Sequence, residues 1–260
     1  MKKLKTQRFQ SFFRKLFGYT CTCCCSGAGF GEFGSNPREA GLCLSCGASN
    51  RNRQMAYVIR KEFSLHEASP LCLPDEVVIY NTESTGAVHA VMKSNLQYHC
   101  SEYFGPEFKG GEMVNGVRHE DLQNLSFEDN ALDLILSSDV LEHMPAPYRA
   151  HAEIFRTLKL GGKHIFTVPF DPSSPTDDCR AELHGDQVRL LKPALYHQDP
   201  VRPDEGILVW FIFGKEMKQR LQAIGFEVQT FFLDAPKRGI IGDGAIVFVA
   251  TKPTSLRRSD

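Results

Sequence analysis

The sequence predicts an α/β fold with a doubly wound, mostly parallel sheet, preceded by a small cysteine-rich knuckle at the N-terminus. Three observations carry this prediction. From about residue 75, apolar strand-like runs alternate with amphipathic helix-like stretches. The last two apolar runs follow each other without a helix, which predicts a hairpin and therefore one antiparallel strand. Six of the nine cysteines lie within residues 21–53.

The elements follow from periodicity. Short, nearly continuous apolar runs bounded by polar residues are typical of strands buried on both faces. Apolar residues spaced three and four apart are typical of helices. The expected strands lie within 76–84, 96–104, 131–144, 163–170, 227–234 and 245–253. The expected helices lie within 49–63, 89–95, 148–162 and 214–226, with Gly161–Gly162 closing the third and Gly225 the last.

The cysteines form two C-x2-C pairs, Cys21 with Cys24 and Cys43 with Cys46. Two such pairs supply the four thiolates of a tetrahedral structural zinc site. Gly47 follows the second pair, where a knuckle turn needs a positive φ. The segment has almost no apolar core of its own, so bound zinc would supply its folding energy.

The first pair is ambiguous, because "CTCCC" also offers Cys23 and Cys25. Cys21 and Cys24 are chosen because they reproduce the spacing of the second pair. Free thiols and an iron–sulfur cluster are the alternatives to zinc. Ser49 is the expected N-cap of the next helix. Arg51 and Arg53 then lie between knuckle and helix, where they either bind an anion or pair with acids of the following domain.

Ligands of doubly wound sheets bind beyond the carboxyl ends of the strands. The polar residues expected there come from separate places in the chain: Thr82–Gly86, Glu102, Asp121, Ser137–Glu142 and Pro169–Asp171. Together they predict one ligand-binding rim.

The run "DLQNLSFEDNALDLILSSDVLEHMPAPYRAHAEIFRTLKLGGKHIFTVPF" resembles the middle of class I S-adenosylmethionine-dependent methyltransferases of the small-molecule type. The pattern continues through "LQAIGFEV", and the upstream "CLSCGASNRNR" is similar to a zinc knuckle that precedes some bacterial members. The resemblance implies a seven-stranded Rossmann-like methyltransferase sheet, with S-adenosylmethionine as cofactor and structural zinc in the knuckle.

The resemblance also implies roles for single residues. Glu102 occupies the position of the acid that accepts hydrogen bonds from the ribose hydroxyls. Asp121 occupies the position of the acid that binds the adenine amino group, and Leu122 would flank the ring. Ser138 and Asp139 would line the turn near the methionine part. For each acid, a solvated loop residue is the alternative.

The first loop departs from the family pattern, which has an acid and then a glycine-rich G-x-G-x-G. In "IYNTESTGAVH", Tyr80 stands at the place of the acid, Thr82 and Ser84 replace two glycines, and Gly86 remains. Either the loop takes another path, with Glu83 receiving the methionine amino group, or cofactor binding is weakened. The residues expected to touch the cofactor here are Thr82, Glu83 and Gly86.

A long connection at about 171–211 separates the strand expected at 163–170 from the last helix, and it is expected to cover the acceptor pocket. Transfer to an oxygen nucleophile usually needs a general base, and histidine suits that task near neutral pH. The candidate catalytic residues are His143, at the end of the segment 131–144, and His197 in the insertion. A structural or surface histidine is the alternative for each.

The first seventeen residues carry six Lys or Arg and no acid, with phenylalanines on one helical face. This basic amphipathic segment is expected to contact an anionic membrane surface or RNA, or to dock on its own protein. No signal peptide or transmembrane run is predicted, so a cytoplasmic location is expected, peripheral to the membrane if the N-terminal helix binds there.

The expected organisation is a basic segment at 1–18, a zinc knuckle at 19–53, a methyltransferase domain at 54–252 and a loose tail at 253–260. The expected function is methyl transfer to a small-molecule or glycan-precursor acceptor. An RNA base methyltransferase is the first alternative, although the large domain shows no basic and aromatic stripe, so nucleic acid is the less favoured partner. A non-catalytic binding module that has kept the fold is the second.

Overall fold

The computed structural model describes residues 18–185, 187–197 and 204–255, so the basic segment and the end of the tail lie outside the described residues. The described chain divides into two compact units. The first contains residues 18–76, 85–98 and 230–247, and the second contains 77–84, 99–229 and 248–255 with the gaps above. Among the described helices, none is both long and apolar enough to cross a membrane.

In the first unit, helix α2 (Asn50–Glu62) follows the knuckle and confirms the expected helix and its N-cap. The Ser49 side chain accepts a hydrogen bond from the backbone N–H of Asn52, and the Asn52 side chain accepts one from the backbone N–H of Ser49. Asn50 is fully buried and donates to the carbonyls of Pro37 and Ile241, at 2.9 and 2.8 Å. The start of α2 is therefore tied to the knuckle loop and to the 230–247 segment.

The first unit also holds α3 (Gly86–Met92) and a short 3-10 helix, η2 (Pro236–Arg238). Asn95, just after α3, accepts a hydrogen bond from the Leu73 backbone N–H at 2.7 Å and donates to the Leu71 carbonyl at 3.3 Å. This buried amide joins the end of α3 to the chain that follows α2.

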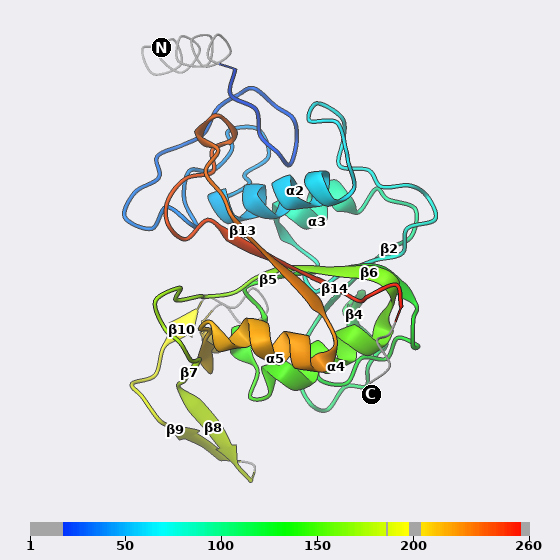
Figure 1. Cartoon of the computed structure of the whole chain (residues 1–260), viewed down its shortest axis with the longest axis vertical. Helices are drawn as coiled ribbons and strands as arrows, with labels where there is room; N and C mark the ends of the chain where they lie inside the picture. The colour runs from blue at the N-terminus through cyan, green and yellow to red at the C-terminus, as the bar shows by residue number, and fades with distance from the viewer. Residues whose placement is uncertain (1–17, 186, 198–203, 256–260) are drawn as a thin grey trace. The chain divides into compact units, whose positions relative to one another are not determined.

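The central sheet is mostly parallel and flanked by helices, as predicted (Figure 1). Its strand order is β13-β14-β6-β5-β1-β2-β4-β3. The strands are β1 (Ile79–Asn81), β2 (Tyr98–Glu102), β3 (Met113–Val114), β4 (Val117–His119), β5 (Leu132–Ser138), β6 (Leu158–Thr167), β13 (Glu227–Phe232) and β14 (Ile246–Thr251). Seven strands were expected, and the two-residue β3 adds an eighth at the edge, antiparallel to β4.

The position of β1 marks the point where the strand order of the sheet reverses. Strand β1 lies between β5 and β2, so the strand order runs outward from it in both directions. β1 pairs with β5 in parallel, β5 pairs with β6 in parallel, and β14 is antiparallel to β6, which confirms the predicted antiparallel strand. Such a reversal of strand order is the topological switch point at which α/β sheets bind ligands.

Helices α4 (Pro147–Thr157) and α5 (Glu216–Ile224) lie next to each other in the second unit (Figure 1). α5 ends at Gly225 with φ +122°, as expected. The expected Gly-Gly cap of α4 is wrong: α4 is capped by Leu158, and Gly161–Gly162 lie within β6. Leu158 is fully buried and pairs with Leu132 of β5. Strand β6 therefore begins at Leu158, three residues before the first of the two glycines.

Lys252 completes the end of α4. Its buried side chain donates to the carbonyls of Phe155 and Leu158 at 2.9 and 2.8 Å, and to the side chain of Asn130 at 2.8 Å. Cations that bind the last carbonyls of a helix satisfy groups without a partner inside the helix.

The connection at 171–211 contains several short strands in the second unit: β7 (Asp178–Cys179), β8 (Ala181–His184), β9 (Gln187–Leu190), β10 (Tyr196–His197) and β11 (Ile207–Leu208), followed by β12 (Phe211–Ile212). β12 pairs with β7, and β10 pairs with β11. Trp210 donates its backbone N–H to the carbonyl of Glu142 at 2.7 Å, which ties the end of the connection to the turn after β5.

Candidate functional site

The loop after β1 lies where the sequence predicts part of the ligand-binding rim. Thr82 is buried, and Ser84 donates both its backbone N–H and its hydroxyl to the same oxygen of Glu102, each at 2.8 Å. Within 82–86 only Gly86 has a positive φ, at +83°. The loop therefore takes a path on which Thr82 and Ser84 need no glycine conformation, and Gly86 serves as the first residue of α3.

Tyr80 does not replace the acid that the family has at this strand end. Its side chain is fully buried, and its hydroxyl shares a 2.7 Å hydrogen bond with the Ser101 hydroxyl of β2. Burial raises the pKa of Tyr80 well above its ordinary value, so the group stays neutral. Tyr80 is therefore a packing residue between β1 and β2.

Asp121 follows β4 and forms an Asx-type turn, with Oδ1 accepting the backbone N–H of Gln123 at 2.8 Å. Leu122 beside it is buried. The neighbouring Glu120 is buried and accepts hydrogen bonds from Arg118 at 2.7 Å and from Ser126. Of the two acids in "HEDL", Glu120 is thus structural, while Asp121 is partly exposed at the strand end.

Strand β5 ends at Ser138, and Asp139 follows it. Asp139 is a non-glycine residue with a φ of +57°, and its Oδ1 accepts a hydrogen bond from the Thr167 hydroxyl at 2.9 Å. Ser138 is buried, with its hydroxyl 3.4 Å from that of Thr167. Left-handed backbone at a non-glycine residue carries a cost and is frequent at binding sites. Thr167 of β6 holds this turn in place.

His143 and His197 meet, although 54 positions separate them in the sequence. The Nε2 atom of His143 lies 3.2 Å from Nδ1 of His197. Oε1 of Glu142 lies 3.6 Å from each of these two nitrogens. Burial, with a contribution from the charge of Asp139, raises the pKa of Glu142 to about 7, and His197 opposes this shift. We call these three residues the Glu–His–His cluster.

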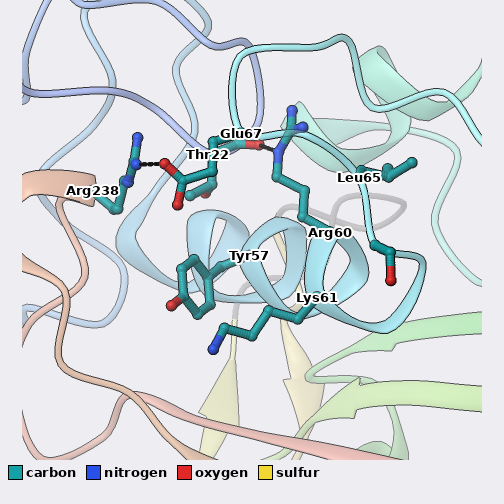
Figure 2. Close-up of a pocket in the computed structure, with 8 residues that line it drawn as sticks. Thr22, Tyr57, Arg60, Lys61, Leu65, Glu67 and Arg238 are labelled. Atoms are coloured by element: carbon teal, nitrogen blue, oxygen red, sulfur yellow. Dashed lines mark hydrogen bonds and ion pairs between the residues drawn. The ribbon is translucent and has the colours of Figure 1, made fainter.

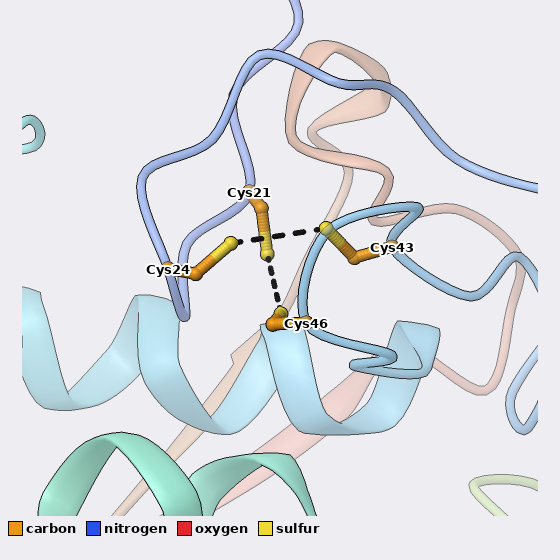
Figure 3. Close-up of side chains that lie close together, drawn as sticks. All are labelled: Cys21, Cys24, Cys43 and Cys46. Carbon is orange, nitrogen blue, oxygen red and sulfur yellow. Dashed lines mark hydrogen bonds between the residues drawn. The ribbon is translucent and has the colours of Figure 1, made fainter.

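The four predicted cysteines come together in the first unit (Figure 3). Sγ of Cys21 lies 3.8 Å from that of Cys46, and Sγ of Cys24 lies 3.8 Å from that of Cys43. A tetrahedral zinc ion with Zn–S bonds of about 2.3 Å has sulfurs about 3.8 Å apart, since the edge of a tetrahedron is about 1.63 times its radius. Two of the six sulfur–sulfur distances therefore match a tetrahedral tetrathiolate site, and all four sulfurs lie within 4.8 Å of one another.

The two turns that carry these cysteines have the same geometry. Gly47 donates its backbone N–H to the carbonyl of Cys43 at 2.9 Å, and Cys25 donates to the carbonyl of Cys21 at the same distance. Gly47 has a φ of +73° and Cys25 a φ of +59°. Cys25 thus takes the backbone role of Gly47, and its thiol donates to the Ser69 carbonyl at 3.0 Å.

The other thiol of the ambiguous run also points elsewhere. Cys23 is buried, and its Sγ donates to the Asn52 carbonyl at 3.4 Å. Of the four cysteines in "CTCCC", only Cys21 and Cys24 place their sulfurs with those of the second pair.

The partners recorded for Arg51 and Arg53 lie in the first unit. Arg51 pairs with Glu39 of the knuckle loop, at 2.6 Å. Arg53 is fully buried, donates to the carbonyls of Ala48 and Gly239, and stacks 4.3 Å from the ring centroid of Phe30. Since Arg53 has no exposed surface, it cannot grip RNA phosphates as the RNA alternative requires.

A hollow of about 270 Å³ lies beside α2 in the first unit (Figure 2). Its charged side chains already have partners. Arg60 donates to the Thr22 carbonyl at 2.7 Å, Arg238 pairs with Glu67, and Lys61 lies 5.3 Å from the ring centroid of Tyr57. The hydrogen bond from Arg60 to Thr22 beside this hollow therefore connects α2 to the knuckle.

Residues 85–166 match the family model described as methyltransferase domain. This match spans Glu102, Asp121, Ser138, Asp139 and His143. The fold of the chain is the Rossmann-like methyltransferase fold. The family match and the strand order together support the assignment of the chain as a class I methyltransferase.

Two curated proteins resemble parts of the chain. An uncharacterized methyltransferase of Mycobacterium marinum is 26% identical over 109 residues, which are 41% of this chain and 43% of that protein. Phthiotriol/phenolphthiotriol dimycocerosates methyltransferase 1 of Mycobacterium ulcerans is 31% identical over 93 residues, 36% of this chain and 32% of that protein. The chain thus spans less than half the length of either relative.

Among solved structures, a SAM-dependent methyltransferase of Methanosarcina mazei superposes with a TM-score of 0.40 at 16% identity, covering 70% of this chain and 95% of that one.

Sequence reasoning included Ser84 and Glu142 in the predicted rim but assigned neither of them a role. The hydrogen bonds from Ser84 to Glu102 have no sequence signature. Glu142 lies beside His143 in "VLEHM", so its proximity was readable. Its complete burial and the approach of His197 were not.

Proposed function

We propose that this chain transfers a methyl group from S-adenosylmethionine to a small-molecule or glycan-precursor acceptor. The match of residues 85–166 to the methyltransferase domain carries the proposal, because it spans the polar residues at the carboxyl ends of β2, β4 and β5. These strands bring their ends to the side of the switch point where such sheets bind nucleotides.

In this proposal Glu102 accepts hydrogen bonds from the ribose hydroxyls, and Asp121 accepts one from the adenine amino group. A carboxylate suits both tasks because it only accepts. Buried Leu122 offers an apolar surface to the adenine ring. Ser138 and Asp139, held by Thr167, face the methionine part, while Thr82, Glu83 and Gly86 form the first loop.

His143 and His197 are the proposed catalytic residues. The Leu208 carbonyl lies 2.9 Å from Nδ1 of His143 and can only accept, so Nδ1 carries the proton and Nε2 offers its lone pair. That nitrogen is the one directed at His197 and Glu142. The pair would receive the proton that an acceptor hydroxyl or carboxyl loses, and in-line positioning of donor and acceptor would supply much of the rate.

The knuckle is proposed to hold a structural zinc ion through Cys21, Cys24, Cys43 and Cys46. Four thiolates leave no open coordination position, so this ion would stabilise the first unit rather than take part in methyl transfer.

Transfer is tested with S-adenosylmethionine labelled in the methyl group and an extract of the cells that produce the chain. After the reaction, the small-molecule, glycan-precursor and RNA fractions are separated and counted. We expect label in the small-molecule or glycan-precursor fraction, and much less of it with Asp121→Ala. Label in RNA would favour the RNA alternative. No label in any fraction, from a protein that binds the cofactor, would contradict the acceptor classes proposed.

A further inference from the structure

The Glu–His–His cluster contains a carboxylate in an unusual environment. The Glu142 side chain is fully buried, and neither of its oxygens has a hydrogen-bond partner among the described residues. Nε2 of His143 and Nδ1 of His197 each lie 3.6 Å from Oε1. A buried carboxylate without hydrogen-bond donors is strongly unfavourable, and either a bound proton or a cation relieves that cost.

The three ligand-type atoms are spaced as metal ligands are. They form a triangle with sides of 3.2, 3.6 and 3.6 Å. The centre of such a triangle lies about 2.0 Å from each corner, and zinc binds imidazole nitrogen and carboxylate oxygen at about 2.0–2.2 Å. One ion could therefore reach all three atoms without displacing any side chain.

The surroundings of the cluster orient its ligands. The carbonyl of Leu208, 2.9 Å from Nδ1 of His143, leaves the Nε2 lone pair directed inward. A backbone carbonyl behind a histidine is the usual outer partner of a metal-bound imidazole. Leu208 belongs to β11, which pairs with β10 in the register His197 with Ile207. The short β10-β11 sheet thus supplies one ligand and fixes another.

The turn that carries the remaining ligand is held as well. Glu142 lies in the 3-10 helix η1 (Leu141–His143), and its backbone carbonyl accepts the N–H of Trp210 at 2.7 Å. The backbone segments that carry the ligands are therefore both held by hydrogen bonds: η1 by the N–H of Trp210, and β10 by its pairing with β11.

We propose that Glu142, His143 and His197 bind a divalent transition-metal ion. Two imidazoles and a carboxylate suit zinc, cobalt or iron better than magnesium or calcium. Three protein ligands leave a coordination position for water or for an oxygen of a second molecule. Metal binding itself does not depend on the proposed function. Use of the open position by an acceptor hydroxyl or carboxyl rests on that function, and the two histidines would then act on the acceptor through the ion.

The test is a Co2+ titration of the full chain, loaded beforehand with one equivalent of zinc. Cobalt bound by thiolates gives intense sulfur-to-metal charge-transfer absorption, whereas nitrogen and oxygen ligands give only weak d–d bands. The wild type is expected to bind one Co2+ with d–d bands alone. His197→Gln and Glu142→Gln are expected to weaken this binding at least tenfold. His184→Gln, an exposed histidine of β8, is the matched control and should bind like the wild type.

Circular dichroism of each variant checks its fold, and the partly exposed His197 makes His197→Gln the safer variant. The proposal is overturned if the wild type binds no cobalt beyond the thiolate site, or if His197→Gln binds cobalt as the wild type does. Binding of S-adenosylhomocysteine to the same samples separates the two claims. If the chain binds S-adenosylhomocysteine but no second metal, the proposed function stands and the metal site is refuted. If it binds the second metal but not S-adenosylhomocysteine, the metal site stands and the proposed function is refuted.

Discussion

Ser84 donates its backbone N–H and its hydroxyl to one oxygen of Glu102, both at 2.8 Å. The residue that replaces a glycine of the family pattern is thus bonded to the acid proposed to bind the ribose. A carboxylate oxygen accepts through two lone pairs, so Ser84 uses the full accepting capacity of Oε1. A ribose diol that binds both oxygens of Glu102 must share Oε1 with Ser84.

This relationship predicts that Ser84→Ala tightens the binding of S-adenosylhomocysteine. Removing the hydroxyl returns one lone pair of Glu102 to the diol, a gain of about one hydrogen bond, or roughly threefold to tenfold in affinity. Calorimetry measures it, with Ser94→Ala, an exposed serine, as control. Weaker binding by Ser84→Ala would mean that the hydroxyl orients Glu102 for the cofactor instead.

The first loop illustrates what the sequence can predict and where it stops. The sequence shows that Thr82 and Ser84 replace two glycines, and it predicts that the loop takes another path or that cofactor binding is weakened. The path itself depends on Glu102, eighteen positions away, so it could not be read locally. By contrast, α2 begins at its predicted cap because Ser49 and Asn52 are neighbours along the chain. The misplaced end of α4 has a tertiary cause, the pairing of Leu158 with Leu132.

Cys24→Ser and Cys25→Gly are predicted to behave differently. Cys24 places its sulfur 3.8 Å from that of Cys43, so its loss should abolish tetrathiolate binding and unfold the knuckle. Cys25 has a φ of +59° and occupies the backbone place of Gly47, so glycine fits there. Charge-transfer absorption of the cobalt-substituted protein should disappear in the first variant and persist in the second. Persistence in Cys24→Ser would reassign the ligands.

Lys252→Met is predicted to lower the free energy of unfolding by about 2 kcal/mol, because carbonyls at the end of α4 lose their buried donor. Urea denaturation of the variant and the wild type measures the difference. Lys218→Met, an exposed lysine of α5, should change the value by less than about 0.5 kcal/mol. Equal effects of the two substitutions would refute the capping role of Lys252.

Stability is predicted to fall below neutral pH because of His151. Both ring nitrogens of His151 are buried without hydrogen-bond partners among the described residues, and burial lowers its pKa from 6.5 to about 3. Below pH 6.5 the unfolded chain takes up a proton that the folded chain excludes, so the free energy of unfolding falls with pH. His151 alone accounts for about 2 kcal/mol between pH 7 and pH 5.

His151→Phe tests this prediction, since phenylalanine fits the aromatic contact with Phe166 and does not titrate. Denaturation at pH 7 and pH 5 should show a smaller loss of stability in the variant than in the wild type. An unchanged difference between the two pH values would assign the acid sensitivity to other groups, such as buried His164.

The candidate site was predicted unevenly. The four clustered cysteines were predicted from their spacing, because the C-x2-C pair occurs twice, once on each side of a loop. The strand pattern placed the acids Glu102 and Asp121 in the predicted rim, and the resemblance supplied their expected roles. The meeting of His143 with His197 lay beyond sequence reasoning, because the pairing of β10 with β11 inside the long connection creates it.

The most direct test of the account is a calorimetric titration of the zinc-loaded chain with S-adenosylmethionine and S-adenosylhomocysteine. We predict micromolar binding of both ligands, weakened at least tenfold by Glu102→Ala and by Asp121→Ala, and unchanged by Glu128→Ala at an exposed carboxylate. If the folded chain binds neither ligand at millimolar concentration, the methyltransferase proposal is wrong, and a binding module that has kept the fold without the cofactor takes its place.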